Sequence, residues 1–330
     1  MGDNFPAGAA SGLGSMPGTD IVEELKFVLG ELPDLPFLPE LPARGPGADM
    51  LGRSAGLLAD LPVELYTGRW RVAAHPGSDL RRTLDLWERD LDALTDAAAG
   101  FTGVLKLSCA GPWTLAASLE LPIGGAVLHD HGAARDLAQS LADGLRAHVA
   151  DVQARVPGAS VVVQLDEPSL PAVLAGKVPT ESGLRTLRAV ATDRARDALS
   201  TVIEAAGVPA VVHCCAPDVP VALLRSAGAV GVSLDLSLLT TAGLDAIGEL
   251  IDAGQTLFAG AVPAVGDRPP ASASVAATVT KLWQRLGFPA ELLPERVVVT
   301  PTCGLAGATP AYARRALTTC AEAARRLSER

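Results

Sequence analysis

Short apolar runs alternate with amphipathic stretches along the whole chain. Eight of the runs are rich in β-branched or other apolar residues and have the length of buried strands. They cover residues 11–15, 35–40, 104–109, 161–165, 210–215, 230–234, 257–262 and 297–300. Between them, apolar residues recur at helical spacing over residues 79–98, 133–154, 182–206, 241–253, 275–286 and 311–327. Eight strands that alternate with helices predict an α/β fold, the (β/α)₈ TIM barrel, because doubly wound sheets usually have fewer strands.

Capping residues mark some of the predicted helix ends. Asp79 and Ser182 are suitable N-caps because their side-chain oxygens can accept free backbone N–H groups of a first helical turn. Gly207 and Gly254 fit the C-terminal side of a helix, where a left-handed residue is common.

Two segments depart from the alternation. Residues 64–72 predict a short hairpin that is inserted outside the barrel. The proline-rich residues 32–46 predict an ordered loop that helps to form a site, rather than a linker between domains. No low-complexity run and no break in composition divides the chain, so we predict a single domain over residues 1–330.

The composition excludes several classes of function. With 48% hydrophobic and 19% charged residues, the chain can bury a large core. The formal net charge of −10 and the lack of a basic run argue against nucleic acid or an anionic membrane as the main partner. No apolar stretch approaches the roughly 18 residues of a membrane span, and no signal peptide is visible. Five cysteines, an odd number in a long chain, predict reduced thiols in the cytoplasm rather than a disulfide framework.

A histidine and two cysteines lie at the ends of two predicted strands. Side chains alternate along a strand, so His213 and Cys215 should face one way and Cys214 the other. Cys303 follows the last predicted strand. One imidazole and two thiolates are ligands that suit zinc. The alternative is that these are ordinary core residues, with a buried and satisfied histidine.

Polar residues also follow most of the other predicted strands. In a (β/α)₈ barrel, the chemistry gathers at the C-terminal ends of the strands. Taken in chain order, these ends carry Gly14 and Ser15, Glu40, Gly111 and Pro112, Asp166 and Glu167, His213 and Cys215, Asp235, and Cys303. Each feature is weak alone, but together they predict one site at the mouth of the barrel.

At this point the chain resembles the cobalamin-independent methionine synthase family, in its C-terminal catalytic barrel. The motifs that carry the resemblance are Gly14-Ser15-Met16-Pro17, Gly111-Pro112-Trp113-Thr114, Gln164-Leu165-Asp166-Glu167-Pro168, His213-Cys214-Cys215, Val232-Ser233-Leu234-Asp235 and Pro301-Thr302-Cys303-Gly304-Leu305. They occur in the family's order and span nearly the whole chain. The His-x-Cys and Cys-Gly-Leu elements are the specific ones.

The resemblance implies a zinc site and a substrate. The implied zinc ligands are His213, Cys215, Asp235 and Cys303. Zinc lowers the pKa of a thiol that binds it, so the thiol of homocysteine could accept a methyl group and form methionine. The implied substrate contacts are Asp166 and Glu40 for the ammonium group and the backbone at Ser15 for the carboxylate, with Glu167, Gly111 and Trp113 as secondary candidates.

The methyl-donor half of the site departs from the family pattern. Ser118 stands near the position where the family has a folate-holding tryptophan, and Trp113 is shifted in register. The family's Asp-His pair for proton delivery has no counterpart in residues 260–265, and Asp235 replaces a glutamate. The donor is therefore either a methyl-folate or a methyl-corrinoid, with a corrinoid protein as a possible carrier.

Two other functions stay open. The chain could transfer a methyl group to a different thiol, as in coenzyme-M methyltransferases with the same His-x-Cys…Cys pattern. It could also be a barrel that binds a ligand without catalysis. A decarboxylase of the uroporphyrinogen type shares the barrel but needs no metal, and the cysteines disfavour it.

Overall fold

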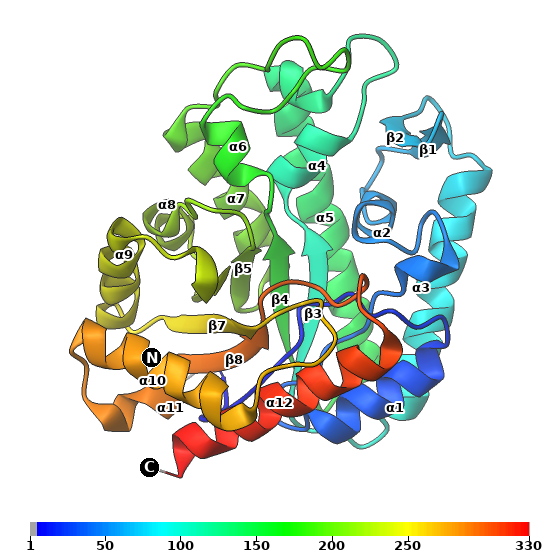
Figure 1. Cartoon of the computed structure of the whole chain (residues 1–330). Coiled ribbons are helices and arrows are strands. Elements are labelled where there is room, and N and C mark those ends of the chain that lie inside the picture. Colours follow the sequence, from blue (N-terminus) through cyan, green and yellow to red (C-terminus); the bar gives the residue numbers. More distant parts are fainter. Residues whose placement is uncertain (1–4, 330) are drawn as a thin grey trace.

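The computed structural model describes residues 5–329, and its centre is a curled parallel sheet of six strands (Figure 1). The strands lie in sequence order, each paired with the next: β3 (Val104–Ala110), β4 (Ser160–Asp166), β5 (Ala210–Cys214), β6 (Gly231–Asp235), β7 (Thr256–Val262) and β8 (Val297–Pro301). Six of the eight predicted strands are thereby confirmed. A parallel sheet with helical crossovers is the arrangement that TIM-barrel-like proteins share.

The first two predicted strands are extended segments that make only isolated bridges. Ala10 bridges to Val299 of β8, Phe37 bridges to Lys106 of β3, and Ser15 bridges to Glu40. The two segments thus link the edges of the sheet without forming regular ladders. Prolines and glycines explain the difference. The chain has prolines at positions 36 and 39, which cannot donate to a ladder, and Gly14 has a left-handed φ of 102°.

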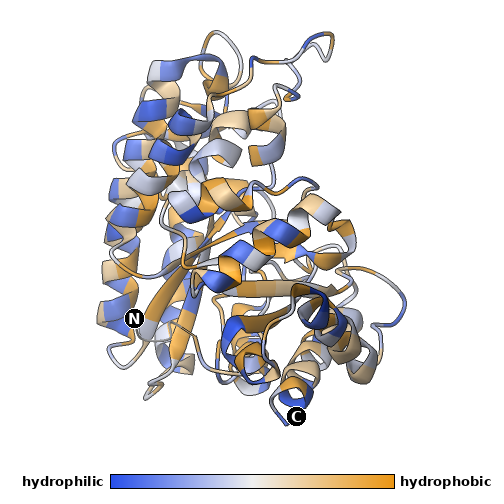
Figure 2. Ribbon diagram, turned by 90° about the vertical axis from the view of Figure 1, so that its left-hand side faces the viewer, coloured by the Kyte–Doolittle hydropathy of each residue, from blue (hydrophilic) through white to orange (hydrophobic). Residues whose placement is uncertain are grey.

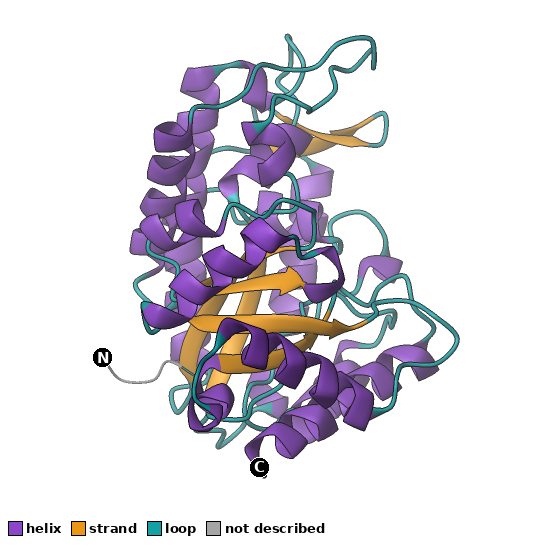
Figure 3. Cartoon of the chain, turned by 60° about the vertical axis from the view of Figure 1, so that its left-hand side comes forward, coloured by secondary structure: helices purple, strands orange, loops and turns teal. Residues whose placement is uncertain are grey.

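Helices cover the outer face of the sheet, with the strands enclosed among them (Figure 3). The α-helices are α1 (Ile21–Glu31), α2 (Met50–Gly56), α3 (Ser78–Ala97), α4 (Pro112–Ser118), α5 (His131–Arg155), α6 (Leu170–Leu174), α7 (Thr192–Ala206), α8 (Val221–Ser226), α9 (Thr241–Asp252), α10 (Ser272–Leu286), α11 (Leu293–Arg296) and α12 (Pro310–Ser328). Short 3₁₀ turns are η1 (Pro42–Arg44), η2 (Val127–His129), η3 (Leu236–Leu238) and η4 (Ala290–Leu292).

Most predicted helices are confirmed, but the one over residues 182–206 begins ten residues late, at Thr192. The prediction was wrong there because Gly183 has a φ of 68°, which a right-handed helix does not allow, and Pro179 bridges to Thr186 in a loop. Asp79 is not an N-cap either. It lies inside α3, and its carboxylate accepts the N–H of Leu65 at 3.1 Å.

The predicted hairpin is confirmed as β1 (Val63–Tyr66) and β2 (Arg69–Val72), which form their own antiparallel pair away from the main sheet. The proline-rich residues 32–46 are ordered, as predicted, and carry the bridges at Phe37 and Glu40. Gly207 and Gly254 have left-handed φ values of 66° and 74° at the ends of α7 and α9, as predicted. Among residues 5–329, no helix is both long and apolar enough to cross a membrane.

The apolar core has two parts. Figure 2 shows that the strands of the sheet are largely apolar and that the surrounding helices carry both apolar and polar residues. The larger part lies between the sheet and the surrounding helices. The smaller part fills the inside of the curled sheet at the N-terminal ends of its strands: Phe5, Ala9, Leu35, Val162, Val211, Phe258 and Val298. The inside of the sheet also contains buried polar side chains, among them Lys106, Gln164 and His213. The fold therefore directs its buried polar side chains towards the C-terminal ends of the strands.

One buried histidine outside the site should make stability depend on pH. His148 of α5 packs edge-on against Trp87, and burial lowers its pKa from 6.5 to about 4. Between these pH values the unfolded chain binds the extra proton, so stability falls as the pH is lowered from about 6.5 to about 4, by about 3 kcal/mol at most. His148→Phe keeps a ring against Trp87 and cannot titrate. Denaturant unfolding at several pH values should show a shallower fall for this variant than for the native chain, and equal slopes would contradict the assignment.

Candidate metal and substrate site

Three of the predicted ligands meet at the C-terminal side of the sheet. His213 is in β5, Cys215 follows that strand directly, and Cys303 follows β8. Their ligand atoms all lie within 4.8 Å of one another. The two sulfurs, Cys215 Sγ and Cys303 Sγ, are 3.1 Å apart, and both cysteines are free thiols. Cys214 lies outside this group and is fully buried, as the alternation of side chains along β5 requires.

The cysteine pair favours a thiolate. The contact with Cys215 lowers the pKa of the Cys303 thiol to about 6, and His213 adds to this effect. The same contact raises the pKa of the Cys215 thiol. A bound cation would hold both sulfurs as thiolates, because metals bind the deprotonated form.

His213 is oriented by a carboxylate. Its Nδ1 lies 2.8 Å from Asp166 Oδ1, at the end of the neighbouring strand β4. Its Nε2 is buried and has no hydrogen-bond partner among residues 5–329. A carboxylate on one ring nitrogen and a bare second nitrogen is the usual arrangement of a histidine that binds a metal. The residues present therefore fit a zinc ion, with two sulfurs and a nitrogen already close together.

Asp235 is separate from this group in the structure. It ends β6, the strand next to β5, but its carboxylate is not among the ligand atoms that lie within 4.8 Å of one another. Its Oδ1 accepts the N–H of Ser237 at 2.8 Å and so caps the short turn η3. The structure thus brings together three of the four predicted ligands, and the role of Asp235 stays a prediction.

Ser15 and Glu40 lie side by side, and Ser15 contacts the segment that follows Cys303. Glu40 N–H donates to the carbonyl of Gly14 at 3.0 Å. Ser15 lies against Gly304, where an added Cβ would overlap Ser15 Oγ, so a larger residue directly after Cys303 would force the Ser15 hydroxyl to move. Burial, and then the nearby Asp166, raises the pKa of Glu40 to about 8. Its Oε1 has no hydrogen-bond partner within the described chain, which leaves it able to bind a substrate group.

Glu167 serves a different purpose from Asp166. It accepts the backbone N–H groups of Trp113 and Thr114 at 2.9 and 2.8 Å, and the Thr114 hydroxyl at 2.8 Å. These groups form the first turn of α4, where a carboxylate is favourable. Burial raises the pKa of Glu167 to about 7 although these hydrogen bonds oppose the shift. Glu167 therefore fixes α4 against the end of β4.

The contact of Glu167 with helix α4 also explains the roles of Gly111 and Trp113, the other secondary candidates. A Cβ on Gly111 would lie 2.6 Å from Glu167 Cδ, so only glycine lets the carboxylate approach the helix. The Trp113 indole is buried and its Nε1 donates to the carbonyl of Ala195 in α7. The indole therefore packs between helices, and only the backbone of Trp113 contacts Glu167.

Lys106 and Gln164 were missed as site residues, and both are completely buried inside the sheet. Lys106 Nζ donates to Gln164 Oε1, and Gln164 Nε2 donates to Asp166 Oδ1 at 2.7 Å. The available signal was a lysine at an inward position of a strand that was predicted to be buried. Burial lowers the pKa of Lys106 to about 8, against the opposing effect of Asp166 and Glu40.

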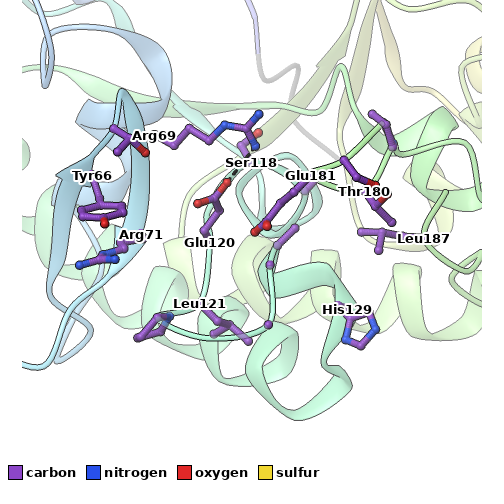
Figure 4. A pocket seen from close by; sticks show the side chains of 18 residues that line it. Tyr66, Arg69, Arg71, Ser118, Glu120, Leu121, His129, Thr180, Glu181 and Leu187 are labelled. Atoms are coloured by element: carbon purple, nitrogen blue, oxygen red, sulfur yellow. Dashed lines mark hydrogen bonds and ion pairs between the residues drawn. The ribbon is translucent and has the colours of Figure 1, made fainter. Parts of the chain in front are cut away.

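A cavity of about 780 Å³ lies at the far end of α4 (Figure 4). It is walled by the β1–β2 hairpin, by residues 117–129 and by residues 179–187, and Ser118 is among its lining residues. Arg69 of the hairpin donates to Glu120 at 2.8 Å across one side of it. The first turn of helix α4 thus contacts Glu167, the residue next to Asp166, and the last turn of the helix borders this cavity.

Comparisons with known proteins identify the family of the chain. A structure titled as a B12-independent methionine synthase from Shewanella sp. W3-18-1 in complex with selenomethionine matches with a TM-score of 0.66 and 14% identity, over 98% of each chain. A methyltransferase from Methanosarcina mazei matches with a TM-score of 0.48 and 17% identity, over 100% of this chain and 95% of that one. A search of curated proteins gave no significant match. The family model described as cobalamin-independent synthase, catalytic domain, matches residues 9–326. The chain therefore belongs to the family of cobalamin-independent synthase catalytic domains and is a methyltransferase.

Proposed function

We propose that the chain, as a single catalytic domain, transfers a methyl group to the thiol of homocysteine and forms methionine. The observation that carries the proposal is the approach of His213, Cys215 and Cys303 to within 4.8 Å at the mouth of a domain of this family. We further propose that these residues hold zinc, with Asp235 as the fourth ligand. Bound zinc would lower the pKa of the homocysteine thiol and keep its sulfur nucleophilic.

The remaining residues would bind and orient the amino acid. Asp166 uses Oδ1 for its contacts with Gln164 and His213, and its Oδ2 has no hydrogen-bond partner among residues 5–329. This oxygen is suited to accept the ammonium group of homocysteine. Glu40 offers a second carboxyl oxygen nearby, and the backbone at Ser15 could receive the carboxylate. Holding the substrate at both polar ends would direct its sulfur towards the incoming methyl group.

The proton balance favours a corrinoid as the methyl donor. A nitrogen of methyl-tetrahydrofolate must be protonated as it leaves, and residues 260–265 contain no acid for this step. A cobalt leaving group needs no proton. The cavity at the end of α4 is where we place the donor. Ser118 lines this cavity near the position of the family's folate-holding tryptophan, so no aromatic side chain stands at residue 118 to stack on a pterin.

The proposal predicts an order of donor rates. Purified, zinc-loaded protein should form methionine from homocysteine faster with methylcobalamin or a methyl-corrinoid protein than with methyl-tetrahydrofolate. Loss of a general acid typically lowers the reaction rate about 100-fold, so we expect a difference of this order between the two donors. Cys303→Ala protein assayed with the same donors gives the background rate of free methylcobalamin with thiols. Rapid turnover with mono- or polyglutamyl methyl-tetrahydrofolate and none above background with any corrinoid would contradict the donor assignment.

The nature of the thiol is the second open point. Transfer to a sulfonate thiol would use the same cysteines and histidine. However, the Oδ2 of Asp166, which is free of hydrogen bonds from residues 5–329, suits an ammonium group, and the charge of this carboxylate would repel a sulfonate. Replacing homocysteine by a sulfonate thiol in the donor assay should therefore leave only the background rate.

A further inference from the structure

A buried lysine lies inside the sheet beneath the site and is connected to His213 through Gln164 and Asp166. Lys106 of β3 is 0% exposed, and its Nζ donates to Gln164 Oε1 and lies 5.5 Å from the centre of the Phe37 ring. A buried ammonium group is costly unless it is paired and hydrogen-bonded. Lysine has donors only, so the atom of Gln164 that faces it must be the amide oxygen.

This contact fixes which way the Gln164 amide points. Its nitrogen must face the opposite side, where it donates to Asp166 Oδ1 at 2.7 Å and to the carbonyl of Leu13 at 3.3 Å. Both of these partners are acceptors, so all of the contacts of the amide agree with a single orientation. Turning the amide over would place two donors together at Lys106 and two acceptors together at Asp166.

The orientation of the Gln164 amide affects His213, because both side chains contact the same oxygen of Asp166. Asp166 Oδ1 accepts from Gln164 and lies 2.8 Å from His213 Nδ1. An oxygen that offers only lone pairs requires a proton on Nδ1, which leaves the lone pair on Nε2. Nε2 is the ring nitrogen that has no partner in the described part of the chain. The second oxygen of Asp166 accepts no hydrogen bond from residues 5–329.

We propose that Lys106 and Gln164 are positioning residues, which hold Asp166 and thereby the Nδ1–H tautomer of His213, so that Nε2 is ready to bind a metal. The proposal rests on the proposed metal site for its purpose, but the tautomer itself is a property of the metal-free protein. Neither residue forms a hydrogen bond with the side chains of His213, Cys215 or Cys303. Lys106→Met should therefore act on His213 through Asp166, by breaking the chain of hydrogen bonds and by removing a positive charge that interacts with this carboxylate.

The test uses ¹⁵N NMR of metal-free full-length protein with labelled histidine, at a pH above the titration of free imidazole. The His213 signals are identified by their loss in His213→Gln. In the native protein we expect one tautomer, protonated at Nδ1. In Lys106→Met we expect a mixture of tautomers. We also expect the dissociation constant for zinc to be about 10- to 100-fold larger, which is the usual effect of removing a hydrogen-bonding partner of a metal-bound histidine. Thr300→Val is the matched control. Its hydroxyl is also buried in the sheet and lacks a partner within residues 5–329, and its replacement should leave the tautomer unchanged.

A double-mutant cycle keeps the proposal testable if one variant folds poorly. Gln164→Leu breaks the chain in the middle, so Lys106→Met should have a much smaller effect in that background than in the native protein. Equal tautomer ratios in native and Lys106→Met protein, or additive losses of zinc affinity in the cycle, would overturn the proposal. A fixed tautomer in a protein that binds no zinc would instead support this proposal and contradict the proposed function.

Discussion

Cys303→Ala is expected to remove bound zinc and to abolish methionine formation. The cysteine pair supplies both thiolates of the proposed site, and the two sulfurs are only 3.1 Å apart. Losing an outer partner of a metal ligand costs about 10- to 100-fold in affinity, so losing a thiolate ligand should cost more than about 100-fold. Zinc content after dialysis and the rate of methionine formation measure both effects.

Two further variants make this result specific. Asp235→Ala should lower zinc affinity and activity less than Cys303→Ala does, because a carboxylate is the weaker partner for zinc here and Asp235 already caps η3. Cys214→Ala removes the neighbouring thiol that lies outside the group, and it should retain zinc. Loss of zinc from Cys214→Ala, or equal losses from the Asp235 and Cys303 variants, would show that the ligand set is different.

Gly111→Ala should strongly destabilise the fold. Its Cβ would overlap the buried Glu167 carboxylate, which would have to leave the first turn of α4. Overpacking costs about 1–3 kcal/mol and a lost cap about 1 kcal/mol, so a loss of roughly 3 kcal/mol is expected. Because Glu167 follows Asp166 directly, a displacement there could also reduce activity about 100-fold.

Gly77→Ala is the control for that variant. Gly77 is likewise an N-cap, at the start of α3, and its backbone is extended with a φ of −105° compared with −75° at Gly111. An added Cβ at Gly77 meets no atom within 4 Å. We expect a loss below about 1 kcal/mol for Gly77→Ala in denaturant unfolding. Similar losses for the two variants would mean that the contact with Glu167 is unimportant.

Local patterns in the sequence were sufficient for much of the fold. Six of the predicted strands and most of the helices follow from apolar runs and helical spacing, and the separate hairpin follows from its own short pattern. The alternation of side chains along β5 also separates Cys215 from Cys214 without any knowledge of the fold. These features depend on neighbours in the sequence, which is why they could be predicted.

Features that depend on contacts between distant segments were harder to predict. The helix predicted from residue 182 begins only at Thr192. The residues before it form a loop in which Pro179 bridges to Thr186 and Gly183 has a left-handed φ. The link from Lys106 to Gln164 depends on the register between β3 and β4, in which Ser108 pairs with Gln164. No local pattern contains that register. The indole of Trp113 likewise finds its partner in α7, 82 residues away.

X-ray absorption at the zinc edge reports the proposed metal site itself, with purified protein measured before and after addition of homocysteine. We expect about one zinc per chain, with two sulfur neighbours at about 2.3 Å and nitrogen or oxygen neighbours completing the shell. Homocysteine should add a third sulfur, because its thiol is the group that zinc is proposed to activate. Protein that binds no zinc when it is supplied, or zinc whose two sulfur neighbours are unchanged by saturating homocysteine, would contradict the account.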